Sequence, residues 1–161
     1  MLSFGHERIE SQLRALEYLV QHLAHWGCDA AAQSAARDVA RYFDSAGAQH
    51  HRDEDRDLFP MLRGLAGRLG RPEVAAVIDE LEREHATMDA QWRRLRPRLH
   101  AIAKARSRAL DAEEIDRFAW LYRRHMDREA AVVLPFAREA LSVEHQAALG
   151  ERMAVRRRSA R

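Results

Sequence analysis

The sequence is short of the residues that break helices or cross-link a chain. Its 161 residues include only seven glycines, four prolines and one cysteine. A single cysteine, Cys28, excludes a disulfide within the chain and is typical of a reducing compartment, so we expect a cytoplasmic protein. No apolar run reaches the ~20 residues needed to span a bilayer. The first residues, MLSFGHERIE, also lack the basic start and apolar core of a secretory signal.

The sequence has little net charge and almost no lysine. Basic residues number 27 and acidic residues 25, and Lys104 is the one lysine among them. Because acidic residues are interspersed with the arginines, the composition predicts a mixed-sign, solvated surface, and we expect no nucleic-acid or membrane partner. The C-terminal run Arg156-Arg157-Arg158-Ser159-Ala160-Arg161 is plainly basic, and we expect a frayed end there.

Alanine, leucine, arginine and glutamate are abundant, and this composition favours helix throughout the chain. Glycine, proline and other turn-forming residues gather near residues 27–29, 64–72 and 110–111. These breaks predict four helices, which we place at residues 5–26, 31–63, 73–106 and 112–141. A short fifth helix at 142–156 should follow, with Ser142 as its N-cap.

The predicted helices carry apolar residues on one face. Ile9, Leu13 and Leu16 recur at helical spacing in the first helix, and no segment alternates as a strand would. Short connections between long amphipathic helices predict one all-α domain over residues 1–161, folded as an antiparallel up-down-up-down four-helix bundle. Seven aromatic residues are expected in its core: Phe43, Phe59, Trp92, Phe118, Trp120, Tyr122 and Phe136.

Two segments of the chain match each other in a way that composition does not explain. The second predicted helix contains a His-x3-Glu-x5-Pro pattern that ends at Pro60, and the fourth contains the same pattern ending at Pro135. Proline inside a helix costs about 3 kcal/mol and usually kinks it, so its recurrence at one offset indicates a repeat. The first and third helices correspond as well, because His6 and His85 are each followed three residues later by an apolar residue.

The repeated spacing suits metal binding for a geometric reason. Residues four apart on a helix lie on the same face, with Cβ atoms ~5–6 Å apart. His50 and Glu54 can therefore reach one ion together, and so can His125 and Glu129. Because a glutamate can bridge two ions, four histidines and two glutamates would suit two metals about 3.5–4 Å apart. Imidazole with carboxylate suits iron, manganese or zinc.

These motifs resemble the hemerythrin family, in its HHE cation-binding branch, and they cover nearly all of the chain. The matching residues are His6-x-x-Ile9, His50-His51-x-x-Glu54-Asp55 before Leu58-Phe59-Pro60, Glu84-His85, and His125-x3-Glu129 before Pro135. The resemblance implies a non-haem di-iron centre with an oxo or hydroxo bridge. It also implies that Glu54 and Glu129 bridge the irons and that the terminal ligands are His6, His50, His85 and His125.

One departure from the family pattern concerns a fifth histidine. Oxygen-carrying hemerythrins have two histidines one turn apart on the third helix, whereas Leu81 and Asp89 stand one turn from His85 here. Either one iron has an open, water-filled position, or His51 supplies the missing ligand. An open position favours redox turnover over reversible oxygen carriage.

The function that we expect is binding or sensing of oxygen, nitric oxide, peroxide or iron itself. The alternative is a di-iron redox enzyme with catalase- or peroxidase-like activity. A ferritin-like centre is disfavoured because its Glu-x-x-His signature occurs once, at Glu82–His85, and Tyr122 stands where a second would need glutamate. The intact ligand set disfavours a metal-free scaffold. Four further histidines are expected outside the centre: His22, His25, His100 and His145.

Overall fold

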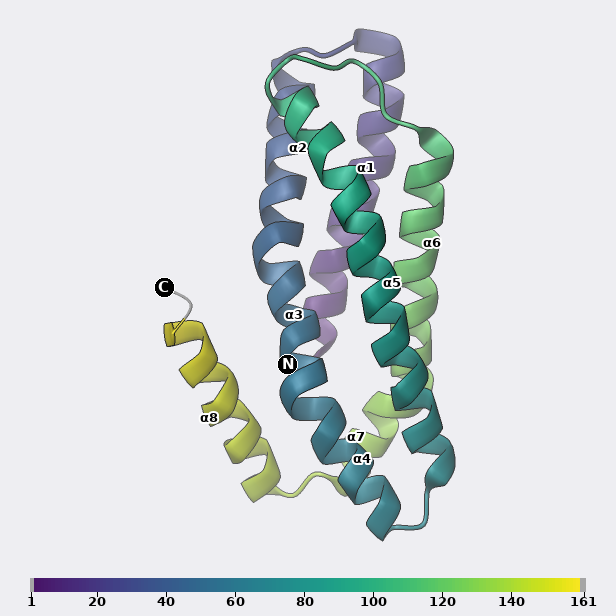
Figure 1. The fold of residues 1–161 in the computed structure, drawn as a ribbon, viewed down its shortest axis with the longest axis vertical. Helices are drawn as coiled ribbons and strands as arrows, with labels where there is room; N and C mark the ends of the chain where they lie inside the picture. Colours follow the sequence, from purple (N-terminus) through teal and green to yellow (C-terminus); the bar gives the residue numbers. More distant parts are fainter. Residues whose placement is uncertain (1, 160–161) are drawn as a thin grey trace. The chain divides into compact units, whose positions relative to one another are not determined.

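The computed structural model describes residues 2–159, and the side chains of residues 5–158. This part of the chain is helical almost throughout and contains no strand (Figure 1). Its α-helices are α1 (Leu2–Trp26), α2 (Ala30–Tyr42), α3 (Ala48–Asp53), α4 (Phe59–Arg68), α5 (Pro72–Ala103), α6 (Ala112–Arg128), α7 (Leu134–Ala140) and α8 (Val143–Ser159). Three π-helical turns join successive helices without a break: η1 (Phe43–Gly47), η2 (Glu54–Leu58) and η3 (Glu129–Val133). The predicted all-α helical bundle with an added C-terminal helix is confirmed.

The helix ends follow the predicted punctuation to within a few residues, with the largest difference at the end of the second helical run. The second helical run continues through Gly64 to Arg68, five residues beyond the predicted end at 63. A glycine within a helix costs only about 1 kcal/mol, and burial of Leu65 and Ala66 offsets that cost. The helix ends instead where Gly70 adopts a φ of 65°, a conformation that suits glycine at a helix C-terminus.

The chain divides into two compact units whose boundaries lie inside continuous helical runs. Unit 1 comprises Met1–Ala48 and Glu84–Met126, and unit 2 comprises Gln49–Arg83 and Asp127–Arg161.

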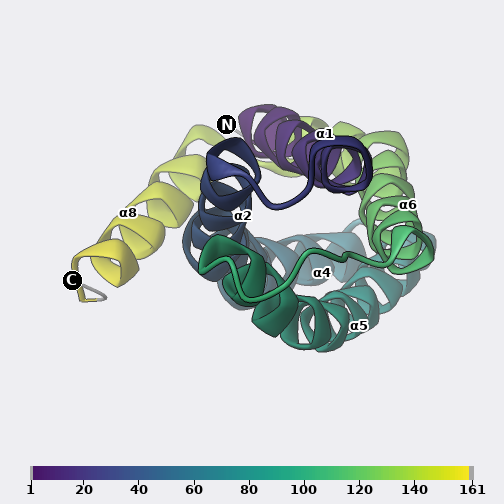
Figure 2. The same ribbon diagram turned by 90° about the horizontal axis from the view of Figure 1, so that it is seen from above.

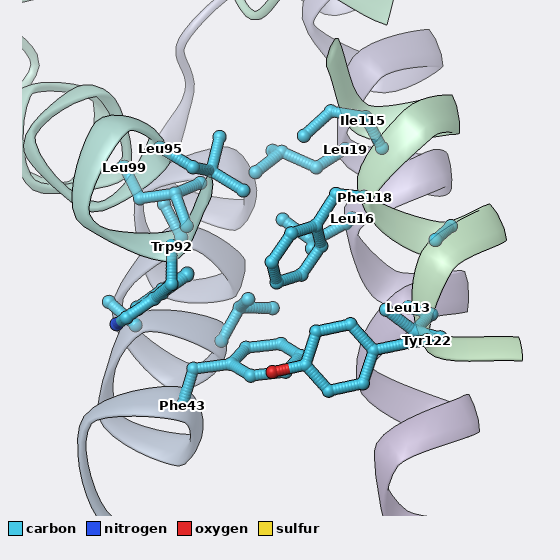
Figure 3. Packing of buried hydrophobic residues seen from close by; sticks show 14 of the residues in the cluster. Leu13, Leu16, Leu19, Phe43, Trp92, Leu95, Leu99, Ile115, Phe118 and Tyr122 are labelled. Carbon is cyan, nitrogen blue, oxygen red and sulfur yellow. The ribbon is translucent and has the colours of Figure 1, made fainter. Parts of the chain in front are cut away.

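Unit 1 contains α1, α2, η1, the second half of α5, and most of α6. Seen end on, these helices lie around a common centre (Figure 2). Aliphatic and aromatic side chains fill that centre (Figure 3). The Phe43 ring meets those of Trp92, Phe118 and Tyr122 at centroid distances of 5.0, 5.3 and 5.5 Å. Because full burial of such a side chain contributes about 1.5–3 kcal/mol, this cluster is a major source of stability in unit 1.

Trp120 is the exception among the seven aromatic residues predicted in the core, because it is 60% exposed. It lies two residues after the core residue Phe118, which turns it about 200° around the helix and away from the core. The Arg124 guanidinium covers its ring at 5.3 Å. The prediction of a core position for Trp120 is therefore wrong.

Unit 2 contains most of α3, η2, α4, the first half of α5, η3, α7 and α8. Its core includes Phe59 and Leu62 of α4, Ile78 of α5, Phe136 of α7, and Leu149 of α8. α8 opens as predicted, because the backbone N–H of His145 donates to the Ser142 hydroxyl at 3.3 Å.

The basic C-terminal run is not frayed along the part that the structure describes. α8 extends to Ser159, and Arg156 and Arg157 form ion pairs with Asp53 and Asp57. The expected frayed end is therefore wrong up to Ser159, because the carboxylates that hold it lie some hundred residues away in sequence. Ala160 and Arg161 lie outside the described residues. Among the described helices, none has the length and apolar character that crossing a membrane requires.

Candidate metal centre

Three of the predicted ligands lie in unit 1, each at the end of a buried apolar stripe. His6 stands one turn before Ile9 on α1, and His85 stands one turn before Met88 on α5. His125 extends the buried face of α6 in the same way. His85 and His125 are buried and His6 is half-buried. The periodicity that builds the core therefore also positions these imidazoles.

His85 and His125 point their Nε2 atoms toward each other. The two atoms are 3.1 Å apart. With metal–nitrogen bonds of about 2.1 Å, two imidazoles bound at a right angle to one metal ion would have nitrogens about 3 Å apart. The same separation suits a direct hydrogen bond between one protonated and one bare nitrogen. The pair is thus compatible with two ligands of a single ion.

Glu84 determines which ring nitrogen of His125 carries no proton. Its Oε2 lies 3.1 Å from Nδ1 of His125, and Arg124 Nη2 lies 3.5 Å from its other oxygen. Because an ionised carboxylate only accepts hydrogen bonds, Nδ1 carries the proton and Nε2 keeps its lone pair in the neutral ring. Such a carboxylate–histidine contact orients a metal ligand and raises its basicity. The sequence assigns no role to Glu84 because its partner lies on another helix, where no spacing reveals it.

The other three predicted ligands, His50, Glu54 and Glu129, come together in unit 2. One ligand atom from each lies within 4.8 Å of those of the others, and His50 Nε2 is 3.0 Å from Glu54 Oε1. The two glutamates are 1% and 0% exposed. Burying two carboxylates so close together is costly unless a positive charge compensates. An oxygen- and nitrogen-donor set of this kind fits iron, manganese or zinc.

Both glutamates begin a π-helical turn, η2 at Glu54 and η3 at Glu129. In each turn, the residue before the proline donates its backbone N–H to the carbonyl of the glutamate five residues earlier. Pro60 and Pro135 follow directly, and a proline ring would clash with the carbonyl four residues before it in a regular α-helix. The wider turn relieves that clash. The repeated proline offset thus produces the same distortion at both glutamates, and such single π turns occur frequently at functional sites.

The position of a fifth histidine differs from the pattern of oxygen carriers, as the sequence indicates. Leu81, one turn before His85, is fully buried, and Asp89, one turn after it, is exposed. His51, the alternative ligand, is buried at 5% exposure beside His50, with ring centroids 6.0 Å apart.

The four remaining histidines contact groups outside the predicted ligand set. Their contacts are His22 Nε2 to Asp29 Oδ1 at 2.9 Å, His25 Nδ1 to Gln21 O at 2.8 Å, His100 Nε2 to Asp44 Oδ2 at 3.8 Å, and the Ser142 backbone N to His145 Nδ1 at 3.3 Å. Asp29 is also the N-cap of α2. These four histidines therefore make their contacts at helix ends or at the surface.

Comparison with known proteins agrees with the resemblance seen in the sequence. A family model described as the hemerythrin HHE cation binding domain matches residues 1–137. A protein of Haemophilus influenzae whose function is uncharacterized is 30% identical over 157 residues, which is 98% of this chain and 88% of the relative. The family match includes all six predicted ligands and ends before α8. The chain therefore belongs to the hemerythrin HHE cation-binding family.

Proposed function

We propose that the chain holds a non-haem di-iron centre, with Glu54 and Glu129 bridging the irons. The terminal ligands in this proposal are His6, His50, His85 and His125, with His51 as a further candidate. The observation that carries the proposal is the approach of one half-buried imidazole and two buried carboxylates to within 4.8 Å in unit 2. The 3.1 Å approach of His85 and His125 in unit 1 supports it, as does membership of a cation-binding family.

Helix continuity supports assigning both groups to one centre. His125 and Glu129 stand four residues apart on the uninterrupted run from α6 into η3, so their side chains project from the same face. The same holds for His50 and Glu54 on the run from α3 into η2. Each pair can therefore contribute one nitrogen and one oxygen to neighbouring ions.

Bound iron would supply redox chemistry and an open coordination position. The protein's residues supply the environment for it. The glutamates offset the positive charge of the ions, and Glu84 holds the Nδ1 proton of His125 so that Nε2 stays available. Met88 and Tyr122, which are buried and stand one turn from His85 and His125 along their helices, would help to keep bulk water away.

We infer that the centre binds or senses oxygen, nitric oxide, peroxide or iron itself, in the cytoplasm. Because His85, His125 and both glutamates are at most 2% exposed, a diatomic molecule or peroxide reaches them more readily than a bulky substrate. Metal binding and a buried donor set are what this function requires.

Leu81 favours a second candidate function, a catalase-like enzyme. An apolar side chain that is 0% exposed occupies the position where an oxygen carrier has its fifth histidine. Unless His51 supplies that ligand, a bound iron would keep one coordination position open to peroxide. Such an enzyme would convert two hydrogen peroxide molecules into two waters and one dioxygen, so no other reductant is needed. A peroxidase-like reaction would require an external electron donor.

The two candidates are separated by exposing the reduced, iron-loaded protein to gas and to peroxide. A spectral change with oxygen or nitric oxide that reverses on gas removal, without oxygen release from peroxide, supports binding or sensing. Rapid autoxidation together with oxygen release from peroxide supports the enzyme. The Glu54→Gln variant, prepared in the same way, controls for iron bound elsewhere on the protein.

A further inference from the structure

The C-terminal helix α8 is attached to the segment that carries Glu54. α8 lies beyond the part of the chain that the family model matches. Within unit 2 it contacts η2. It runs in the opposite direction to the helical run that contains this turn and at an oblique angle to it (Figures 1 and 2). Arg156 Nη1 lies 2.7 Å from Asp53 Oδ1, and its Nη2 lies 2.5 Å from Asp57 Oδ2. Arg157 adds a contact of 3.0 Å to the other oxygen of Asp53.

The two aspartates are placed where their charges need compensation. They are 6% and 5% exposed, stand one turn apart, and flank Glu54 in sequence. Buried carboxylates at this spacing repel each other unless a cation lies between them. A planar guanidinium meets this need well, because each terminal nitrogen can donate to a different carboxylate. Arg156, on another helix, supplies that cation.

Ion pairing is a large part of what attaches α8. Leu149 and Met153 are the buried hydrophobic side chains of this helix, whereas Val143 and Val155 are 77% and 48% exposed. Two buried aliphatic side chains provide a small apolar anchor for a helix of 17 residues. The attachment therefore depends strongly on the pairs that Arg156 forms with Asp53 and Asp57.

We propose that α8 is a clamp on the metal centre. Through Arg156 it holds the π-helical turn η2 in shape, so that the position of the Glu54 carboxylate depends on the C-terminal helix. Asp53, Asp57 and Arg156 are positioning residues and are not among the proposed metal ligands. The consequence for metal retention rests on the proposed di-iron function, whereas the clamp itself is a property of the metal-free chain.

The clamp is needed because η2 has few ways to stabilise itself. Pro60 prevents the turn from relaxing to a regular α-helix, and π-helical hydrogen bonding is rare outside single turns. Without Arg156, the repulsion between Asp53 and Asp57 acts directly on the turn. The expected result is local opening at residues 54–59, with unit 1 unaffected.

Hydrogen exchange in the metal-free protein tests the clamp alone. Amides of residues 54–59 should exchange about tenfold faster in Arg156→Ala than in the wild type, because local opening exposes them. Arg152→Ala is the matched control: this exposed arginine lies one turn earlier on α8, and its removal should leave exchange unchanged. The clamp would be overturned if amides 54–59 of Arg156→Ala exchanged at the wild-type rate. It would also be overturned if the amides of residues 88–99, in unit 1, were accelerated to the same extent.

Iron release tests the link to the metal centre. Transfer of iron to a ferrous chelator should be about tenfold faster from Arg156→Ala than from the wild type or Arg152→Ala, the scale typical of losing a residue that supports a ligand. Arg156→Lys, which keeps the charge without the forked geometry, should fall between them. Accelerated exchange with unchanged iron release would overturn the link. A wild-type protein that takes up no iron, yet shows the exchange difference, would refute the di-iron function and leave the clamp standing.

Discussion

The side chains of the candidate centre approach one another closely in buried surroundings. His50 and Glu54 come within 3.0 Å, and His85 and His125 within 3.1 Å. Substituting one member leaves its partner buried with less compensation, which is costly for charged groups in particular. Single substitutions here should therefore change metal occupancy strongly, whereas histidines elsewhere should matter little.

Replacing either of the two glutamates proposed to bridge the irons should remove a bridge and most of the metal. We expect Glu54→Ala and Glu129→Ala to fall from about two irons per chain to less than one, because a two-metal site needs both carboxylates. His22→Ala and His145→Ala should keep the wild-type iron content. Metal analysis of the four purified variants makes the comparison. Two irons retained by Glu54→Ala would show that the bridging assignment is wrong.

Glu84 should affect metal affinity without being a ligand. Glu84→Gln keeps an oxygen that can accept from His125 Nδ1 but loses the negative charge, so affinity should fall about tenfold, and Glu84→Ala should approach a hundredfold loss. Competition with a chelator measures both. Glu80→Gln, one turn earlier on α5 and paired with Arg128, should bind as the wild type does. If Glu84→Ala bound metal as tightly as the wild type, Glu84 would have no role in metal affinity.

Residue spacing in the sequence is enough to predict the four candidate histidines and the two glutamates. Their spacing within each helix is a local signal, and the repeat doubles it. Glu84 and the aspartate pair beside η2 cannot be assigned in this way, because their partners His125 and Arg156 lie on distant parts of the chain. Sequence spacing carries no information about which helices become neighbours.

At the scale of the elements, the helices could be predicted and the π turns could not. Glycine, proline and N-cap residues mark helix ends directly, and Ser142 opens α8 as expected. A proline at position 60 or 135 predicts a distortion, but several hydrogen-bonding patterns relieve it, and the wider turn is found only in the structure. Trp120 was predicted in the core because it is aromatic, yet its side chain is exposed. Aromatic character alone does not show which face of a helix a residue occupies.

The pairing of α1 with α6 should make stability dependent on acid pH. Arg123 reaches Glu10 at 3.0 Å and Glu17 at 2.6 Å, and the hydrogen bond from Arg123 is the main cause that lowers the pKa of Glu10 below its ordinary 4.5. A carboxyl with a lowered pKa stabilises the fold above its ordinary pKa, and this stabilisation disappears as pH falls through the lower folded-state value.

Arg123→Ala should therefore be less stable than the wild type by about 1 kcal/mol at pH 7, since the pairs are partly exposed. The difference should shrink as pH falls below 4.5 and through the lower folded-state pKa of Glu10. Urea unfolding at pH 7 and at acid pH measures it. Arg117→Ala, which removes an exposed pair with Glu113, should have little effect at either pH. A difference that stays constant with pH would contradict the assignment.

For the whole molecule, the proposed ligands come from all four long helical runs. Metal binding to such a set should stabilise the fold by mass action, because the unfolded chain does not hold the ligands together. The assignment of the chain to one family is shown by a match over residues 1–137. The interpretation of residues 1–161 as a single hemerythrin-like domain remains a prediction.

Removing the metal should lower the melting temperature of the protein. At free iron a hundred times the dissociation constant, binding contributes about 2.7 kcal/mol, so the Tm of the wild type should rise with added iron and fall with a chelator. Glu54→Ala should show little dependence on either addition. Differential scanning calorimetry measures the Tm of both proteins with and without iron. A wild-type Tm that does not change when iron binds would contradict coupling between the metal centre and the stability of the fold.

The most direct test of the di-iron centre is the metal content of the purified protein, measured together with its ultraviolet–visible spectrum. A bridged centre on these residues predicts about two irons per chain and the near-ultraviolet charge-transfer bands of bridged ferric iron. Zinc or manganese in the place of iron, or no metal after reconstitution with iron, would contradict it.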